Sequence, residues 1–185
     1  MPDRQRTLNP IIRYAAYVLI AVVCVYAVYC LYCAWWWRPV TTVVVVRHAE
    51  KLDLPGDDDP LDPDAGVARA QTLTHVLEHT GVTAVYATGW VRTQDTAQPT
   101  AAAAGLAVLP YADAAALADT IRADHSGGVV LVVGHSNTVT TILEELGGDP
   151  VGLIADSDYD NLFVVTLRRC GGTRVTHLQY GEATS

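Results

Sequence analysis

Lysine and cysteine are scarce in this 185-residue chain, and each shortage excludes some classes of site or partner. Three of the four cysteines fall in one apolar segment, so there is neither a disulfide framework nor the paired spacing of a zinc site. Lys51 is the single lysine, and residues 42–185 hold 19 Asp or Glu against 8 Lys or Arg, for a net charge of −11. Nucleic acid and anionic membrane surfaces are therefore poor general partners.

The N-terminal part is apolar. Residues 14–37 carry no formal charge, and a helix of that length crosses a hydrocarbon core of about 30 Å. A cleaved secretory signal is the alternative, but the run is longer than usual and no Ala-x-Ala-like site follows it. We therefore expect an uncleaved signal anchor at 14–37.

The flanking charges predict its orientation. Three arginines precede the segment, and Arg38 alone directly follows it. By the positive-inside rule, residues 1–13 should lie in the cytoplasm and the C-terminal domain outside it. The preceding arginines are Arg4, Arg6 and Arg13.

The length of residues 42–185 suits one globular domain, in which runs of β-branched residues alternate with helical patterns. Repeated β-α units predict an α/β fold: a mostly parallel sheet with helices on both faces and an antiparallel C-terminal edge. Strands are expected at 41–46, 82–87, 106–109, 129–133, 161–167 and 173–178. Helices are expected at 67–79, 114–123, 137–146 and from 88 onward, the last one kinked or restarted by Pro99.

Two polar motifs each follow a run of β-branched residues: RHAE at 47–50 and GHSN at 134–137. Runs of this kind favour buried strands, so both motifs should lie at the carboxyl edge of the sheet, where α/β proteins bind ligands. We expect His48 to be exposed at that edge.

The residue types in these motifs suit phosphoryl transfer. A neutral imidazole such as that of His48 can attack phosphorus and form a phosphohistidine, which water then cleaves. Negative charge on the transferred oxygens requires donors already in position, and the planar fork of arginine matches phosphate oxygens. Arg47, Arg92 and His135 are the candidate donors.

Two other clusters deserve weighing as metal sites. His75, Glu78 and His79 match the H-x-x-E-H pattern of inverted zincins, but both histidines fall on the solvent side of the expected helix. An aspartate-rich loop resembles a calcium site only in composition, because two prolines break the EF-hand spacing. Solvated surface explains both clusters better, and we expect no metal. The aspartates are Asp57, Asp58, Asp59, Asp62 and Asp64.

In these motifs the chain resembles the histidine phosphatase superfamily, in its phosphoglycerate mutase-like branch. The likeness covers nearly all of residues 42–185. In size, this domain is closest to the small single-domain phosphohistidine phosphatases. It implies that His48 is the phosphoryl acceptor, that Arg47, Arg92 and His135 form the phosphate pocket, that Ser136 contacts substrate, and that no cofactor is needed. The matching residues are 47–51, Pro60, Leu61, Gly66, Arg69, Ala70, Thr88, 92–97, 134–136 and 159–163.

The insertion that carries the proton donor in larger relatives is missing. Larger relatives carry an acidic proton donor in an insertion, whereas residues 109–113 lead straight into a helix. Glu50 and Asp113 are the remaining candidates. A phosphohistidine substrate needs less acid, because its leaving group is a fairly stable imidazole.

The sequence therefore predicts a membrane-anchored, metal-independent phosphoric monoester hydrolase, acting on a small phosphorylated molecule or a phosphoprotein. The alternatives are a phosphoglycerate mutase-like phosphotransferase and a non-catalytic phosphate- or partner-binding module on a membrane stalk.

Overall fold

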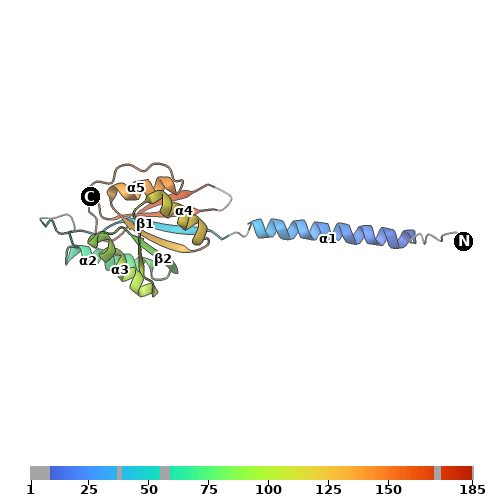
Figure 1. Cartoon of the computed structure of the whole chain (residues 1–185), viewed down its shortest axis with the longest axis horizontal. Helices are drawn as coiled ribbons and strands as arrows, with labels where there is room; N and C mark the ends of the chain where they lie inside the picture. The colour runs from blue at the N-terminus through green and yellow to red at the C-terminus, as the bar shows by residue number, and fades with distance from the viewer. Residues whose placement is uncertain (1–8, 37–38, 55–58, 169–171, 185) are drawn as a thin grey trace. The chain divides into compact units, whose positions relative to one another are not determined.

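The computed structural model describes residues 9–36, 39–54, 59–168 and 172–184. The chain divides into two units between residues 38 and 39, and each is described by itself (Figure 1).

The first unit contains one helix, α1 (Pro10–Trp36). Its first turn is capped by Asn9, whose side-chain oxygen accepts a hydrogen bond from the Ile11 N–H at 3.1 Å. Residues 10–34 are long and apolar enough to cross a membrane, and their large apolar side chains are exposed. The helix starts four residues before the expected segment and includes Arg13, while Trp37, Arg4, Arg6 and Arg38 lie outside the described residues.

The second unit is built on a six-stranded mixed sheet in the order β3-β2-β4-β1-β5-β6. The first four strands in that order run parallel, and the last two are antiparallel to their neighbours. The predicted fold class is thus confirmed. The strands are β1 (Thr41–Arg47), β2 (Val82–Ala87), β3 (Val108–Pro110), β4 (Val129–Gly134), β5 (Asn161–Leu167) and β6 (Arg174–Gln179).

Helices cover both faces of the sheet. In Figure 1, α2 (Ala65–Leu77) and α3 (Val91–Ala104) lie on one side, and α4 (Ala114–Asp124) and α5 (Ser136–Glu145) on the other. Successive β1 side chains point to opposite faces, so Val43 and Val45 pack with α4 and α5, while Val44 and Val46 pack with α2 and α3. A strand buried on both faces explains the unbroken run of valines.

Two local expectations were wrong. Of the two outcomes expected at Pro99, a kink or a restart, the restart is wrong, since α3 runs through this residue with Ala97 and Ala101 fully buried on either side. Their burial holds the helix together across the missing N–H donor. The third strand begins at Val108 because Leu106 still belongs to the helix end, where its N–H donates to the Ala101 carbonyl at 2.8 Å.

The turn after β1 is pressed against the start of α2. A Cβ atom added to Gly66 would lie 2.3 Å from the Glu50 carbonyl oxygen, so no larger residue fits without movement. The Asp62 N–H also donates to that oxygen, at 2.9 Å. These contacts fix the segment that carries His48.

Candidate active site

His48 directly follows β1, and its backbone is fixed on two sides. Its N–H donates to the Gly134 carbonyl at the end of β4, at 2.8 Å, and the next N–H, of Ala49, donates to Thr96 Oγ1 of α3 at 2.9 Å. The residue is only 3% exposed, so the expectation of an exposed histidine was wrong. The rings of His135 and Tyr159 lie beside its imidazole, at centroid distances of 5.3 and 5.9 Å.

The ring of His48 is held in one tautomer. Its Nδ1 lies 2.7 Å from the carbonyl oxygen of Ala49. A carbonyl can only accept a hydrogen bond, so Nδ1 carries the proton and the neutral ring keeps a lone pair on Nε2. Burial lowers the pKa of His48 to about 3, aided by the charges of Arg47, His135 and Arg92 and opposed by the bond to Ala49.

His135 lies beside this ring, at the N-terminus of α5. The two imidazole centroids are 5.3 Å apart. His135 Nε2 is 3.0 Å from Thr88 Oγ1, which is in turn 2.8 Å from Thr93 Oγ1. The Thr93 hydroxyl donates to backbone carbonyls, so Thr88 donates to Thr93 and accepts from His135. Burial lowers the pKa of His135 to about 4, with help from Arg92 and Arg47.

Arg47, the last residue of β1, has a side chain that is 5% exposed. Its Nη1 donates to the carbonyls of Ala155 at 2.8 Å and Asp158 at 3.4 Å, and its Nη2 lies 3.6 Å from Asp156 Oδ1. The guanidinium also lies 4.4 Å from the centre of the Tyr159 ring. Its buried Nε makes no hydrogen bond to any residue that the structure describes, and so keeps a donor for a ligand.

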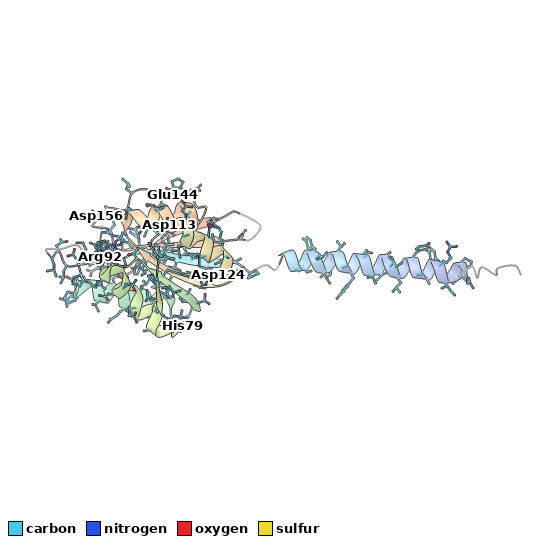
Figure 2. The ribbon with its side chains drawn as sticks, viewed as in Figure 1. His79, Arg92, Asp113, Asp124, Glu144 and Asp156 are labelled. Atoms are coloured by element: carbon cyan, nitrogen blue, oxygen red, sulfur yellow. The ribbon has the colours of Figure 1, made fainter. Side chains whose placement is uncertain are left out.

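Arg92 is the second residue of α3. Its guanidinium lies 4.7 Å from the centre of the Trp90 ring, and that ring meets His135 edge-on at 6.2 Å. Its positive charge acts on both His48 and His135. Figure 2 shows Arg92 and Asp156 at the same end of the domain.

The structure thus brings His48, Arg47, Arg92 and His135 together around the carboxyl ends of β1, β2 and β4. Two guanidinium groups beside two neutral imidazoles have the chemistry needed to bind an anion and to present a nucleophile to it. Ser136 is the next residue in α5, and its hydroxyl lies 3.4 Å from Asp156 Oδ1.

Both candidate proton donors have other partners. Glu50 accepts three hydrogen bonds of 2.7–2.9 Å from Arg69, whose Nη1 also donates to the Tyr180 carbonyl. Asp113 caps α4 by accepting from the Ala116 N–H at 2.7 Å. Both carboxylates are thus committed to structural contacts, Glu50 with Arg69 and Asp113 with the first turn of α4.

The candidate metal clusters lie outside this group. His75 and His79 have side chains 80% and 90% exposed, and both contact Glu78. Asp59 instead binds Lys51 at 2.6 Å, which lowers the pKa of its carboxyl. Across the described ranges, no group of three or more His, Cys, Asp or Glu could hold a metal, and Asp57 and Asp58 fall outside those ranges.

Sequence reasoning gave no role to two aromatic residues of the site. Tyr159 stacks on Arg47 and lies 5.9 Å from His48, and Trp90 lies between Arg92 and His135. Tyr159 falls within a segment that matched the resemblance, which was the available signal. For Trp90 the only signal in the sequence was its position two residues before Arg92.

No protein-family model matches this chain, and no curated protein matches it. Solved structures do. The protein histidine phosphatase SixA, complexed with tungstate, superimposes with a TM-score of 0.59 at 20% identity, covering 75% of this chain and 96% of that one. A mycobacterial glucosyl-3-phosphoglycerate phosphatase gives 0.58 at 14% identity, covering 76% and 98%.

A phosphoserine phosphatase from Entamoeba histolytica, in complex with 3-phosphoglyceric acid, gives a TM-score of 0.55 at 15% identity, covering 77% of this chain and 98% of that one. The second unit therefore has the fold of these phosphatases. The resemblance to the histidine phosphatase superfamily, inferred from the motifs, is confirmed at the level of the fold.

Proposed function

We propose that this protein is a membrane-anchored phosphatase that transfers a phosphoryl group from its substrate to His48 and then to water. The observation that carries the proposal is the state of His48. A buried imidazole with its Nδ1 proton committed to Ala49 is neutral at physiological pH and offers Nε2 as a nucleophile.

The first step forms one bond and breaks one. The Nε2 lone pair attacks phosphorus, and the bond from phosphorus to the leaving group breaks with its electron pair on that group. Negative charge on the transferred oxygens would be stabilised by the Nε of Arg47 and by Arg92. In the second step, water attacks the phosphohistidine, which releases inorganic phosphate and restores the lone pair.

The engagement of Glu50 and Asp113 supports substrates whose leaving groups need little protonation. A phosphorylated imidazole, as in phosphohistidine, is such a substrate, because the ring departs as a fairly stable species. The same chemistry accommodates small phosphorylated molecules with good leaving groups. An alkoxide leaving group would need a proton donor, and both candidate carboxylates are committed to other partners.

The membrane part of the proposal rests on α1, and its orientation on the arginines before it. With residues 1–13 in the cytoplasm, the catalytic domain would act outside it.

The test is to trap the covalent intermediate on the full chain in neutral detergent. Wild type, quenched rapidly after mixing with a substrate carrying labelled phosphate, should hold an acid-labile, base-stable phosphoryl group, whereas His48→Gln should hold none and lose turnover by about three orders of magnitude or more. The matched control is His79→Gln, which changes an exposed histidine and should behave like wild type.

The substrates should include a phosphohistidine peptide, phosphomonoesters and phosphoglycerate, with and without chelator. Turnover that survives in His48→Gln would refute the assignment of His48 as the nucleophile. Transfer of the label to a second phosphoglycerate molecule would favour the mutase-like alternative. Phosphate binding without turnover in wild type would favour the non-catalytic one.

A further inference from the structure

A second cationic site lies at the end of the domain opposite His48. A cavity of about 510 Å³ opens beside the amino ends of the parallel strands. Figure 2 shows Asp124, the last residue of α4 and a sequence neighbour of the lining residue Ala123, at the opposite end of the domain from Arg92. The cavity is lined by Pro39, Thr41, Arg122, Ala123, Ser126, Leu167, Arg168 and Thr173.

The described positive charges of this acidic domain differ in what they contact. Arg47 and Arg92 belong to the candidate active site, and Lys51 and Arg69 pair with Asp59 and Glu50. Three more, Arg122, Arg168 and Arg174, lie toward the amino ends of the parallel strands. Arg174 is not part of the cavity wall. Two of so few cations lining one cavity, against a net charge of −11, indicate an anion site, as the pair at the candidate active site does.

The two arginines of the wall differ in how they are held. Arg122 is positioned by its neighbours, since Nη2 donates to the Glu145 carbonyl and Nη1 lies 3.5 Å from Asp119. Arg168 is exposed and makes no hydrogen bond or ion pair within the described part of the chain. Its guanidinium therefore keeps its full set of donors, and the Asp119 contact, at the protein surface, neutralises Arg122 only weakly.

The hydroxyl groups of the wall divide in the same way. Thr41 and Thr173 donate to the carbonyls of His125 and Leu146, whereas the exposed Ser126 makes no such bond to any residue that the structure describes. The apolar part of the wall consists of Pro39, Ala123 and Leu167. Two guanidinium groups and a hydroxyl beside a small apolar surface suit a phosphate that carries an organic substituent.

The cavity wall begins close to α1 in the sequence. Only residues 37 and 38 separate Pro39, in the cavity wall, from the last residue of α1. If α1 spans a membrane, as proposed above, the chain that leaves the membrane continues directly into the cavity wall, which favours a ligand supplied by the membrane surface.

We propose that this cavity binds a phosphate-bearing headgroup, with Arg122 and Arg168 contacting the phosphate. The same chemistry could be supplied by a free organic phosphate, and the experiment separates the two sources. The site is independent of His48 and would remain if the chain lacked phosphatase activity.

The experiment is native mass spectrometry of the full chain in neutral detergent, titrated with dihexanoyl phosphatidylglycerol in one arm and with glycerol 3-phosphate in the other. Removing both guanidinium groups in R122Q/R168Q should weaken binding of the anionic lipid by about tenfold or more. The control is R174Q, which removes one positive charge from the same edge but outside the cavity, and should bind within about twofold of wild type; R168Q, which removes one charge from the cavity wall, is the variant matched to it in charge. Turnover of a soluble substrate should be unchanged in the double variant and in R174Q.

The two titrations, with the lipid and with glycerol 3-phosphate, identify the source of the phosphate group. Binding of the lipid that is lost in R122Q/R168Q, and that glycerol 3-phosphate does not compete with, assigns a membrane headgroup. Glycerol 3-phosphate binding that is lost in the same variant assigns a free organic phosphate. Equal lipid and glycerol 3-phosphate binding by wild type, R122Q/R168Q and R174Q would overturn the proposal. If the double variant misfolds, R168Q alone serves, because that side chain supports no described contact.

Discussion

Lowering the pH tests the electrostatics of the site directly. At pH 5, an imidazole with the ordinary pKa of 6.5 is about 3% neutral, whereas one with a pKa of about 3 is about 99% neutral. The fraction of His48 able to act as a nucleophile should therefore be about thirtyfold larger than for an unburied histidine. A substrate phosphate titrates near pH 6, so turnover alone would mix two ionisations.

The measurement is the carbon-13 chemical shift of the histidine Cε1 atoms across pH 7 to 4, on the full chain in neutral detergent. The signal missing from His48→Gln identifies His48, and it should not pass through a midpoint near 6.5. Circular dichroism at each pH confirms that the fold persists. A His48 midpoint at or above 6 would refute the reasoning, because burial would then not control the ring.

The lowered pKa of His48 also makes the free energy of unfolding depend on pH. Below pH 6.5 the unfolded chain binds a proton at residue 48, while the folded chain does not until about pH 3. The free energy of unfolding should therefore fall as the pH is lowered from 6.5 towards 3. His48→Gln should lose less of it between pH 7 and 5 than wild type does, as measured by urea unfolding. Equal losses would contradict the linkage.

Three further outcomes are expected. Arg92→Lys keeps the charge but loses the planar fork, so turnover should drop by about tenfold or more, with Arg174→Lys as the unaffected control. Gly66→Ala places a methyl group against the Glu50 carbonyl and should lower the unfolding free energy by about 1–3 kcal/mol, whereas Gly152→Ala, with no atom within 4 Å of the new Cβ, should cost much less. Protease added to intact cells or spheroplasts should digest the C-terminal domain and spare cytosolic proteins, and full protection would reverse the proposed orientation.

The order of strands and helices could be predicted because its signals are local. The valine runs of β1 and β4 fix two buried strands, and the turn residues between elements fix the alternation that makes a parallel sheet. The errors came where long-range packing overrides a local rule. Pro99 stays inside α3 because the core holds the alanines on either side of it.

The candidate site was predicted less completely, for the same reason. The pairing of His48 with His135 follows from strand register, since β1 and β4 are neighbours and end together. The burial of His48 and the stacking of Tyr159 on Arg47 depend on segments far apart in the chain, which leave no periodic pattern. The Arg69–Glu50 pair likewise joins two residues whose contact depends on how α2 packs.

The carbonyls that hold Arg47 come late in the chain, and this decides how early in synthesis the proposed site can form. Arg47 and His48 emerge from the ribosome early, but the carbonyls that hold Arg47 belong to residues 108 and 111 positions later. A nascent chain that stops short of Ala155 carries every proposed catalytic residue and yet lacks both carbonyls that hold the Arg47 guanidinium. Assembly of the proposed anion site thus waits for the segment that precedes β5, and with it any hydrolysis by an unfinished chain.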